Sequence, residues 1–301
     1  MPISSAFHLI GGTSAGGILS TFLTTPAEPG STQPKYSAEE LVQILQQRSA
    51  DMFVQRYLSC YGLFGPKYRT DRFRSVLSEY LEHTTVDDAI TPTAVVTFDM
   101  VRQNLKTITS WDTGEIFTKV NAISATAAAI SYFEPCHAVP TNHALTSYFL
   151  TDGGTGANNP TLCLIAEAKK LYPDANSFEI ISVGSGRADK PLHFKDMKRA
   201  GLVHWARHLP RMFMDGEASK DHIFLSEAFE PHTDGYGVDH SSYKGNYSRW
   251  NPLLSHQNTR LDNTDPENLR AILKATDLHI ELRRAEYDAL VTRLSVPKTR
   301  F

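Results

Sequence analysis

Ser14 stands between Gly12 and Gly16, in a setting where a serine can act as a nucleophile. The apolar run 7–10 (FHLI) precedes this turn, and the helix-patterned stretch 15–23 follows it. A G-x-S-x-G sequence between a strand and a helix is typical of a nucleophile elbow, a sharp turn that exposes the serine hydroxyl. We expect that side chains at positions 12 and 16 would keep the strand and the helix apart. The alternative interpretation is an ordinary glycine-rich turn.

Asp152, far downstream, is a second candidate, because its carboxylate stands at the end of a predicted strand and before two glycines. Asp152 follows the strand-like run 147–151 and precedes Gly153 and Gly154. Glycines at these positions permit unusual backbone angles and close approach of neighbouring chain. The segment Asn159-Pro160 then has the sequence of a helix start, with Asn as N-cap and Pro at the first helical position. The alternative interpretation is an Asx turn before a helix.

Ser14 and Asp152 together could hydrolyse an ester. A serine hydroxyl becomes a good nucleophile when a neighbouring base accepts its proton. A carboxylate within hydrogen-bond reach can accept that proton and later return it to the leaving alcohol. An ester leaving group needs less protonation than an amide, so a two-residue device favours esters. The backbone N–H of Ala15, at the start of the helix, is a natural donor to the developing oxyanion.

Several segments, in this order, closely resemble the patatin-like phospholipase family. They are GTSAGG at 12–17, TFD at 97–99, the Ala/Ser-rich run before Tyr132-Phe133, DGG at 152–154 and ANNPT at 157–161. The resemblance extends from about Phe7 to Gly186 and thins beyond that point.

The resemblance implies a serine–aspartate dyad that acts on fatty-acyl esters of phospholipids or other lipids. In the family's motifs Ser14 takes the place of the nucleophile and Asp152 that of the base. Gly12, Ala15, Gly16, Gly153 and Gly154 then support the elbow and the oxyanion. We expect this hydrolysis to need no metal and no cofactor. A lipid substrate also implies transient contact with a membrane surface.

The sequence departs from the family before the elbow. Family members carry a D-G-G-G-x-[RK]-G loop there, which supplies further oxyanion donors, and residues 1–6 (MPISSA) hold no such loop. Losing one oxyanion donor typically costs about 2.7–4 kcal/mol of transition-state stabilisation. The alternatives are therefore a truncated enzyme, or a weakened or inactive relative. Such a relative would act as a storage or binding protein, or as one half of a split site that a partner segment completes. We also expect an exposed sheet edge and self-association into a homo-oligomer.

A third alternative is a Ser-His-Asp esterase. It would need a histidine late in the chain near Ser14, and the candidates are His256 and His279. Neither stands in a recognisable catalytic context, so the dyad remains our prediction.

Charge, apolar runs and cysteine count indicate which classes of function and location fit the chain. The 301-residue chain has a net charge of −3, and this balance gives no sign of nucleic-acid binding. We find no run of about eighteen apolar residues, the length of a membrane span, and no signal-peptide pattern at the start. The three cysteines, Cys60, Cys136 and Cys163, fit reduced thiols in a cytoplasmic protein.

Histidine spacing favours no metal site. The chain has twelve histidines, and His222, His232 and His240 are not spaced as metal ligands.

The pattern of elements predicts a three-layer α/β/α sandwich with a mostly parallel central sheet, formed as one domain over residues 1–301. Ser37 with Glu40 forms a capping box, and another helix follows Thr70. Strand patterns cover 93–99, 105–110 (antiparallel to the first), 147–151 and 178–183. Further helix patterns cover 116–129, 195–213, 219–229, 266–276 and 278–295.

Two other features have ordinary structural interpretations. Asp99 ends the strand 93–99 at a position that matches the family, and we expect it to shape a turn rather than to catalyse. The aromatic-rich segment 52–64 could form an apolar lip that touches lipid, but aromatic stripes usually pack in a core, and we favour packing.

Overall fold

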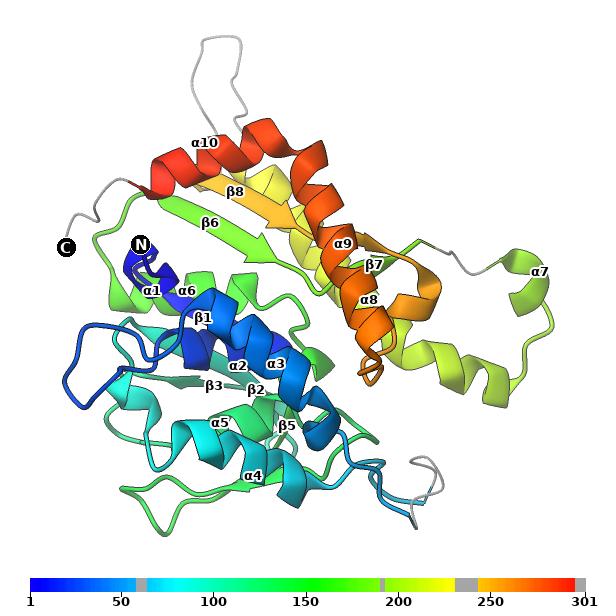
Figure 1. Cartoon of the computed structure of the whole chain (residues 1–301), viewed down its shortest axis with the longest axis horizontal. Coiled ribbons are helices and arrows are strands. Elements are labelled where there is room, and N and C mark those ends of the chain that lie inside the picture. Colours follow the sequence, from blue (N-terminus) through cyan, green and yellow to red (C-terminus); the bar gives the residue numbers. More distant parts are fainter. Residues whose placement is uncertain (58–63, 190–192, 231–242, 296–301) are drawn as a thin grey trace. The chain divides into compact units, whose positions relative to one another are not determined.

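The computed structural model of the chain describes residues 1–57, 64–189, 193–230 and 243–295 (Figure 1). Its contacts divide the chain into two compact units. The first contains Met1–Leu164 and Ala285–Phe301, and the second contains Ile165–Arg284. The single domain over residues 1–301 stays a prediction.

The first unit is built from a five-stranded sheet and its covering helices. Its elements are α1 (Ile3–Ala6), β1 (Ile10–Thr13), α2 (Ala15–Leu23), α3 (Ala38–Met52), α4 (Thr70–Leu81), β2 (Thr93–Asp99), β3 (Asn104–Thr109), α5 (Lys119–Thr126), β4 (Cys136–Ala138) and β5 (Tyr148–Asp152). α6 (Thr161–Leu171) begins in this unit, and α10 (Arg284–Leu294) lies almost wholly within it.

The strand β2 organises the sheet. Along one edge it pairs with β3, over residues 94–99. Two strands share the other edge of β2. β1 pairs in parallel with residues 93–96, and β5 pairs antiparallel with residues 97–99. β4 extends the sheet antiparallel to β5. The predicted α/β fold is confirmed, but the sheet is mixed rather than mostly parallel, because β5 approaches β2 from the end opposite to β1.

Helices cover both faces of β1. Successive residues of a strand face opposite ways. A side chain at Gly12 would meet α2, whereas one at Gly11 would meet Leu164 of α6. These contacts give the layered arrangement of an α/β sandwich.

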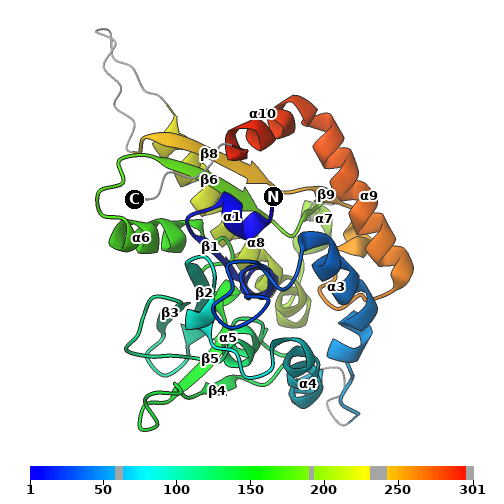
Figure 2. The same cartoon turned by 60° about the vertical axis from the view of Figure 1, so that its left-hand side comes forward.

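Two apolar clusters hold the first unit together. One joins α2, α3, α4 and α5 through buried side chains such as Phe22, Leu41, Leu77 and Ile123. The other lies between α5 and the sheet and includes Val95, Ile108 and Leu150. α4 lies beside α5 in both views of the chain (Figure 1, Figure 2). Burial of these side chains fixes α2 and α5, the helices next to Ser14 and Asp152 in the fold.

The second unit contains two short parallel strand pairs and long helices. Its elements are β6 (Phe178–Val183), β7 (Arg187–Ala188), α7 (Phe194–Met197), α8 (Leu202–Phe229), β8 (Gly245–Trp250), β9 (Leu253–Leu254) and α9 (Pro266–Leu282). β6 pairs with β8, and β7 pairs with β9. α8 packs against β8, and Arg249 of β8 donates to the hydroxyl of Ser182 in β6 at 2.6 Å.

Most sequence-based elements are confirmed. The errors are shifted boundaries, a different division of the helices after residue 194, and short strands such as β4 and β8 that were not predicted. The capping box of Ser37 and Glu40 is present at the start of α3. α5 is shorter than the predicted 116–129. The helices predicted at 195–213 and 219–229 form the separate α7 and the single long α8, which runs through Pro210. α6 begins at Thr161, so the helix starts after Asn159-Pro160 rather than on it.

Candidate active site

Ser14 occupies the sharp turn between β1 and α2. β1 ends at Thr13 and α2 begins at Ala15, so Ser14 is the single residue between strand and helix. Its backbone angles are φ 54° and ψ −123°. A positive φ is uncommon for a residue with a side chain and is strained. The strand–turn–helix geometry predicted for a nucleophile elbow is present, while the catalytic role of Ser14 stays a prediction.

The two elbow glycines differ in what they do. A Cβ at Gly12 would lie 2.2 Å from the backbone carbon of Gly16, so only glycine fits there. A Cβ at Gly16 would meet no atom within 4 Å outside its own helix. The expectation that both positions must be glycine is therefore wrong for Gly16. The backbone of Gly16 lies close to Gly12, whereas a side chain at Gly16 would point away from Gly12 into open space.

The shared edge of β2 brings the two candidate residues together. Thr13, which precedes Ser14, pairs with Val96, and Asp152 pairs with Thr97, the next residue of β2. The ends of β1 and β5 therefore meet. Across this junction the hydroxyl of Ser14 donates to Oδ2 of Asp152 at 2.7 Å.

Close packing around Asp152 explains the glycines that follow it. A Cβ at Gly153 would lie 2.3 Å from the carbonyl oxygen of Val96, so β2 requires a residue without a side chain there. The N–H of Gly154 donates to Oδ1 of Asp152 at 2.7 Å. The two glycines thus hold the carboxylate, one by allowing close approach and the other by a hydrogen bond.

The environment of Asp152 suits a base that works near neutral pH. Its side chain is almost wholly buried, and this burial raises the pKa of Asp152 to about 6. The hydrogen bonds from Gly154 and Ser14 favour the carboxylate and oppose that rise. A pKa just below neutrality leaves the group ionised at pH 7 and still basic enough to take a proton.

We expect the stability of an Asp152→Asn variant, relative to wild type, to depend on pH. The pKa of Asp152 is about 6 in the folded chain against 3.8 for the free group. The folded protein therefore binds the proton more tightly, and wild-type stability falls as pH rises from about 4 to 6. Asparagine does not titrate. The variant should gain about 2–3 kcal/mol of unfolding free energy over wild type at pH 8, with almost no difference at pH 4.

Urea unfolding of both proteins at pH 4, 5, 6 and 8 measures this difference. Acid effects elsewhere in the chain act on both proteins and cancel. A difference that stays constant across this range would contradict a burial-raised pKa.

Thr126, which sequence reasoning did not single out, binds the backbone of Ser14. The N–H of Ser14 donates to Oγ1 of Thr126 at 2.8 Å, and Thr126 donates in turn to the carbonyl oxygen of Val96 at 2.6 Å. The sequence indicated only a helix of small residues here. The N–H of Ala15, the first residue of α2, has no acceptor within its helix and remains the candidate oxyanion donor.

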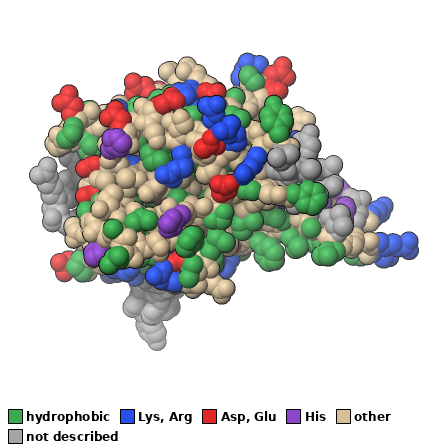
Figure 3. Space-filling model, turned by 90° about the horizontal axis from the view of Figure 1, so that it is seen from below, with side chains coloured by type: hydrophobic (Ala, Val, Ile, Leu, Met, Phe, Trp, Pro, Cys, Tyr) green, Lys and Arg blue, Asp and Glu red, His purple; other side chains and the backbone are tan. Residues whose placement is uncertain are grey.

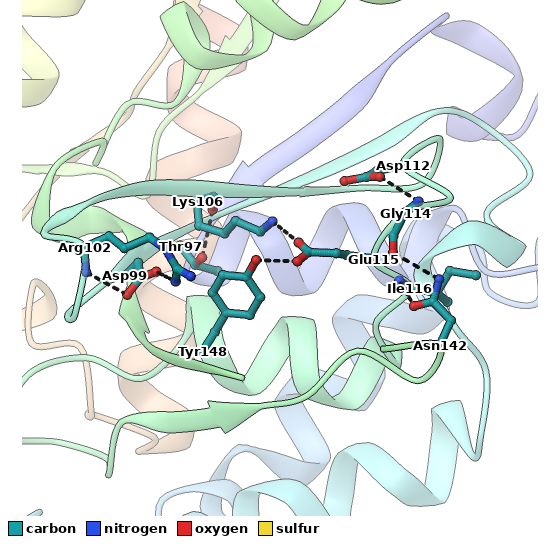
Figure 4. Close-up of polar contacts among 10 residues, drawn as sticks. All are labelled: Thr97, Asp99, Arg102, Lys106, Asp112, Gly114, Glu115, Ile116, Asn142 and Tyr148. Atoms are coloured by element: carbon teal, nitrogen blue, oxygen red, sulfur yellow. Dashed lines mark hydrogen bonds and ion pairs between the residues drawn. The ribbon is translucent and has the colours of Figure 1, made fainter. Parts of the chain in front are cut away.

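Asp99 shapes a turn, as expected. Its buried carboxylate accepts hydrogen bonds from the N–H groups of Val101 and Arg102 and from the guanidinium of Arg102. Burial alone would raise the pKa of Asp99, but these bonds together hold it below its usual value. Figure 4 shows this ion pair next to a second group, in which Glu115 lies between Lys106 and Tyr148. Both groups hold the β2–β3 hairpin and its neighbours in place.

Other sequence-based candidates lie elsewhere or outside the described residues. His279 is in the second unit, where its ring packs edge-on to Trp250. Cys136 and Cys163, the two cysteines among the described residues, are not joined in a disulfide. Cys60, His232, His240 and residues 58–63 of the aromatic segment lie outside the described residues. Within the part of the chain that the structure describes, no three His, Cys, Asp or Glu side chains gather as a metal-ligand set.

Comparison with known proteins identifies the family. The sequence profile described as "Patatin-like phospholipase" matches residues 3–165, more than half of the chain. The chain belongs to the patatin-like phospholipase family. This match contains the elbow, β2, α5, β5 and the glycines after Asp152. Membership supports lipid acyl hydrolysis at the level of the family.

Individual patatin-like relatives are distant. "Patatin-like protein 4" of Arabidopsis thaliana is 26% identical over 273 residues, covering 80% of this chain and 68% of that protein. "Patatin-like protein 2" of Oryza sativa subsp. indica is 29% identical over 232 residues, covering 67% and 57%. "Patatin-11" of Solanum tuberosum is 26% identical over 294 residues, covering 90% and 72%. The chain thus aligns with little more than half of the rice relative's length.

Proposed function

We propose that this patatin-like chain hydrolyses fatty-acyl esters of phospholipids or other lipids, with Ser14 as nucleophile and Asp152 as base. The observation that carries the proposal is the 2.7 Å hydrogen bond from the Ser14 hydroxyl to Asp152, made at a strained elbow. This bond meets the geometric requirement for a nucleophile and its base. The raised pKa of Asp152 supports the assignment, because perturbed carboxyl groups gather at functional sites.

The proposed reaction has two halves. Ser14 Oγ attacks the acyl carbonyl carbon while Asp152 takes the hydroxyl proton, and the N–H of Ala15 stabilises the oxyanion. The tetrahedral intermediate collapses, and Asp152 returns the proton to the departing alcohol. In the second half Asp152 takes a proton from water as that water attacks the acyl-serine. Ser14 regains the proton as leaving group, and the fatty acid is released.

Exposed apolar side chains lie on α2 and β5, the elements next to Ser14 and Asp152, and just beyond α5. Leu19 of α2 is 39% exposed, Ile130 beyond α5 is 68% exposed and Phe149 of β5 is 47% exposed. Hydrophobic side chains also reach the surface among charges of both signs on the face drawn in Figure 3. We propose that Leu19, Ile130 and Phe149 contact the acyl chain or the lipid surface during transient binding. No described helix has the length and apolar character needed to cross a bilayer. Self-association and a cytoplasmic location stay predictions.

Release of fatty acid tests the proposed activity directly. The substrates are phosphatidylcholine vesicles and a p-nitrophenyl ester of a short fatty acid. Mass spectrometry after an acid quench should find the acyl group on the peptide that contains Ser14. If the protein releases no acid from either substrate and Ser14 stays unmodified, a lipid-binding or storage relative becomes the better interpretation.

Histidine variants separate the dyad from a triad. We expect His279→Ala and His256→Ala each to retain most of the ester hydrolysis, because in the dyad the base is Asp152. In a Ser-His-Asp esterase, removal of the histidine lowers kcat by several orders of magnitude. A fall of about a thousandfold in kcat for either variant, with the fold intact by circular dichroism, would favour the triad.

A further inference from the structure

The C-terminal end of α5 contacts both halves of the candidate dyad. On one side, Oγ1 of Thr126 accepts the N–H of Ser14 at 2.8 Å. On the other side, the carbonyl oxygen of Ala128 accepts the N–H of Asp152 at 3.1 Å and the hydroxyl of Thr151 at 2.6 Å. These partners lie more than a hundred residues from Ser14 and more than twenty from Asp152 in sequence. One helix end therefore holds two separate strand ends.

Thr126 is itself held in place from two directions. Its side chain is wholly buried, and its hydroxyl donates to the carbonyl oxygen of Val96 at 2.6 Å. That bond fixes the proton of the hydroxyl, so its lone pairs face the N–H of Ser14. Its methyl group occupies the space beside Gly17, where an added Cβ would lie only 2.6 Å from it. The rotamer of Thr126 is thus determined by β2 and α2 together.

We propose that Thr126 is a positioning residue that holds the strained backbone of Ser14, so that its hydroxyl reaches Asp152. Ser14 has a φ of 54°, a conformation that persists only when the surroundings over-determine it. Its N–H has no partner within α2, because it precedes the helix, so loss of the Thr126 hydroxyl would leave a part-buried donor unpaired. The inference adds a positioning residue to the proposed function. Its expected effect on kcat rests on that function.

The test compares Thr126→Val, which has the same shape without the hydroxyl, with Thr126→Ser, which keeps the hydroxyl. The control is Thr25→Val. Thr25 is also buried, and its hydroxyl donates to the carbonyl oxygen of Thr21 at 2.7 Å, at the far end of α2. We expect Thr126→Val to lower kcat about 10- to 100-fold with KM nearly unchanged. Thr126→Ser and Thr25→Val should each stay within about threefold of wild type.

A second readout does not depend on hydrolysis. Residue-resolved amide exchange should show the Ser14 N–H protected in wild type and Thr126→Ser, and exchanging about 10- to 100-fold faster in Thr126→Val. The exchange of buried amides in the middle of α2 should not change. If Thr126→Val leaves both kcat and Ser14 exchange at wild-type values, the inference is overturned. If wild type hydrolyses no ester but the exchange changes as expected, the proposed function fails while the positioning of Ser14 stands.

A second pair of variants tests the inference if Thr126→Val does not fold. Gly17→Ala should push the methyl group of Thr126 aside and reproduce the faster exchange of Ser14. Adding Thr126→Ser to Gly17→Ala removes that methyl group and should restore part of the protection of the Ser14 N–H. Recovery is partial because the added Cβ also lies 3.2 Å from Cγ1 of Val95 and from Oγ1 of Thr126, and Thr126→Ser removes neither contact. Normal exchange at Ser14 in Gly17→Ala, or no recovery in the double variant, would overturn the inference.

Discussion

Replacing Ser14 with alanine, or Asp152 with asparagine, should each lower kcat for ester hydrolysis by at least about a thousandfold. Alanine removes the oxygen that attacks the ester in the proposed mechanism. Asparagine keeps the shape and can still accept the N–H of Gly154, but it cannot take the proton of Ser14. The losses should not add in the double variant, because the two residues act as a unit in the proposed mechanism. Initial rates on a p-nitrophenyl ester and on phosphatidylcholine vesicles measure the effect.

Asp99→Asn is the matched control for Asp152→Asn. Asp99 is also a buried carboxylate at the end of a strand, but its hydrogen bonds go to the turn at residues 101–102. We expect this variant to lose stability while the folded protein keeps its activity. Full activity in Asp152→Asn would remove Asp152 from the mechanism. An equal loss in Asp99→Asn, in protein shown to be folded, would mean that the test does not isolate a base.

Alanine at the two elbow glycines should have opposite effects on stability. Gly12→Ala places a methyl group 2.2 Å from the backbone of Gly16, and backbone cannot move aside as a flexible side chain can. We expect a loss of about 3 kcal/mol or more, enough to unfold a marginally stable protein. Gly16→Ala places its methyl group in open space in the first turn of α2. Better helix propensity should then raise stability by up to about 1 kcal/mol.

Urea unfolding of the two variants beside wild type measures the contrast. The substitution is the same in both, and the positions are four residues apart in one turn, so each variant serves as the control for the other. Similar losses in both would show that the elbow needs glycine at position 16 as well, as the sequence motif alone suggested. Similar stability in both would mean that β1 and α2 can separate at little cost.

The sequence located the elements of the first unit well where the signal was local. The strand at 93–99 is β-branched and buried, and its bounds as β2 match the prediction. The helix after Ser37 begins with its capping box. The sequence could not predict that β5 runs antiparallel to β2. A strand pattern carries no information about its partner, and the antiparallel pairing of Asp152 with Thr97 depends on contacts distant in sequence.

In the candidate site, too, residues marked by their sequence neighbours could be predicted, whereas residues that act through distant contacts could not. Ser14 and Asp152 could be singled out because glycines mark the turns that carry them. Thr126 could not, because a threonine among small residues in a helix pattern has no distinctive neighbours. The hydrogen bond of Thr126 to Ser14 exists only once α5 lies across the sheet. The different roles of Gly12 and Gly16 likewise follow from the path of the folded backbone.

The hydrogen bonds around the candidate dyad also restrict how an inhibitor could attach if Ser14 is the nucleophile. A phosphonate or boronate bonded to Ser14 carries a charged oxygen that needs N–H donors. The N–H of Ser14 is already bound to Thr126, and that of Gly154 to Asp152. The first turn of α2, which begins directly after Ser14 at Ala15, offers N–H groups without acceptors in their own helix. Compounds built to direct that oxygen toward Ala15, and their bulk away from α5, should therefore label Ser14 fastest.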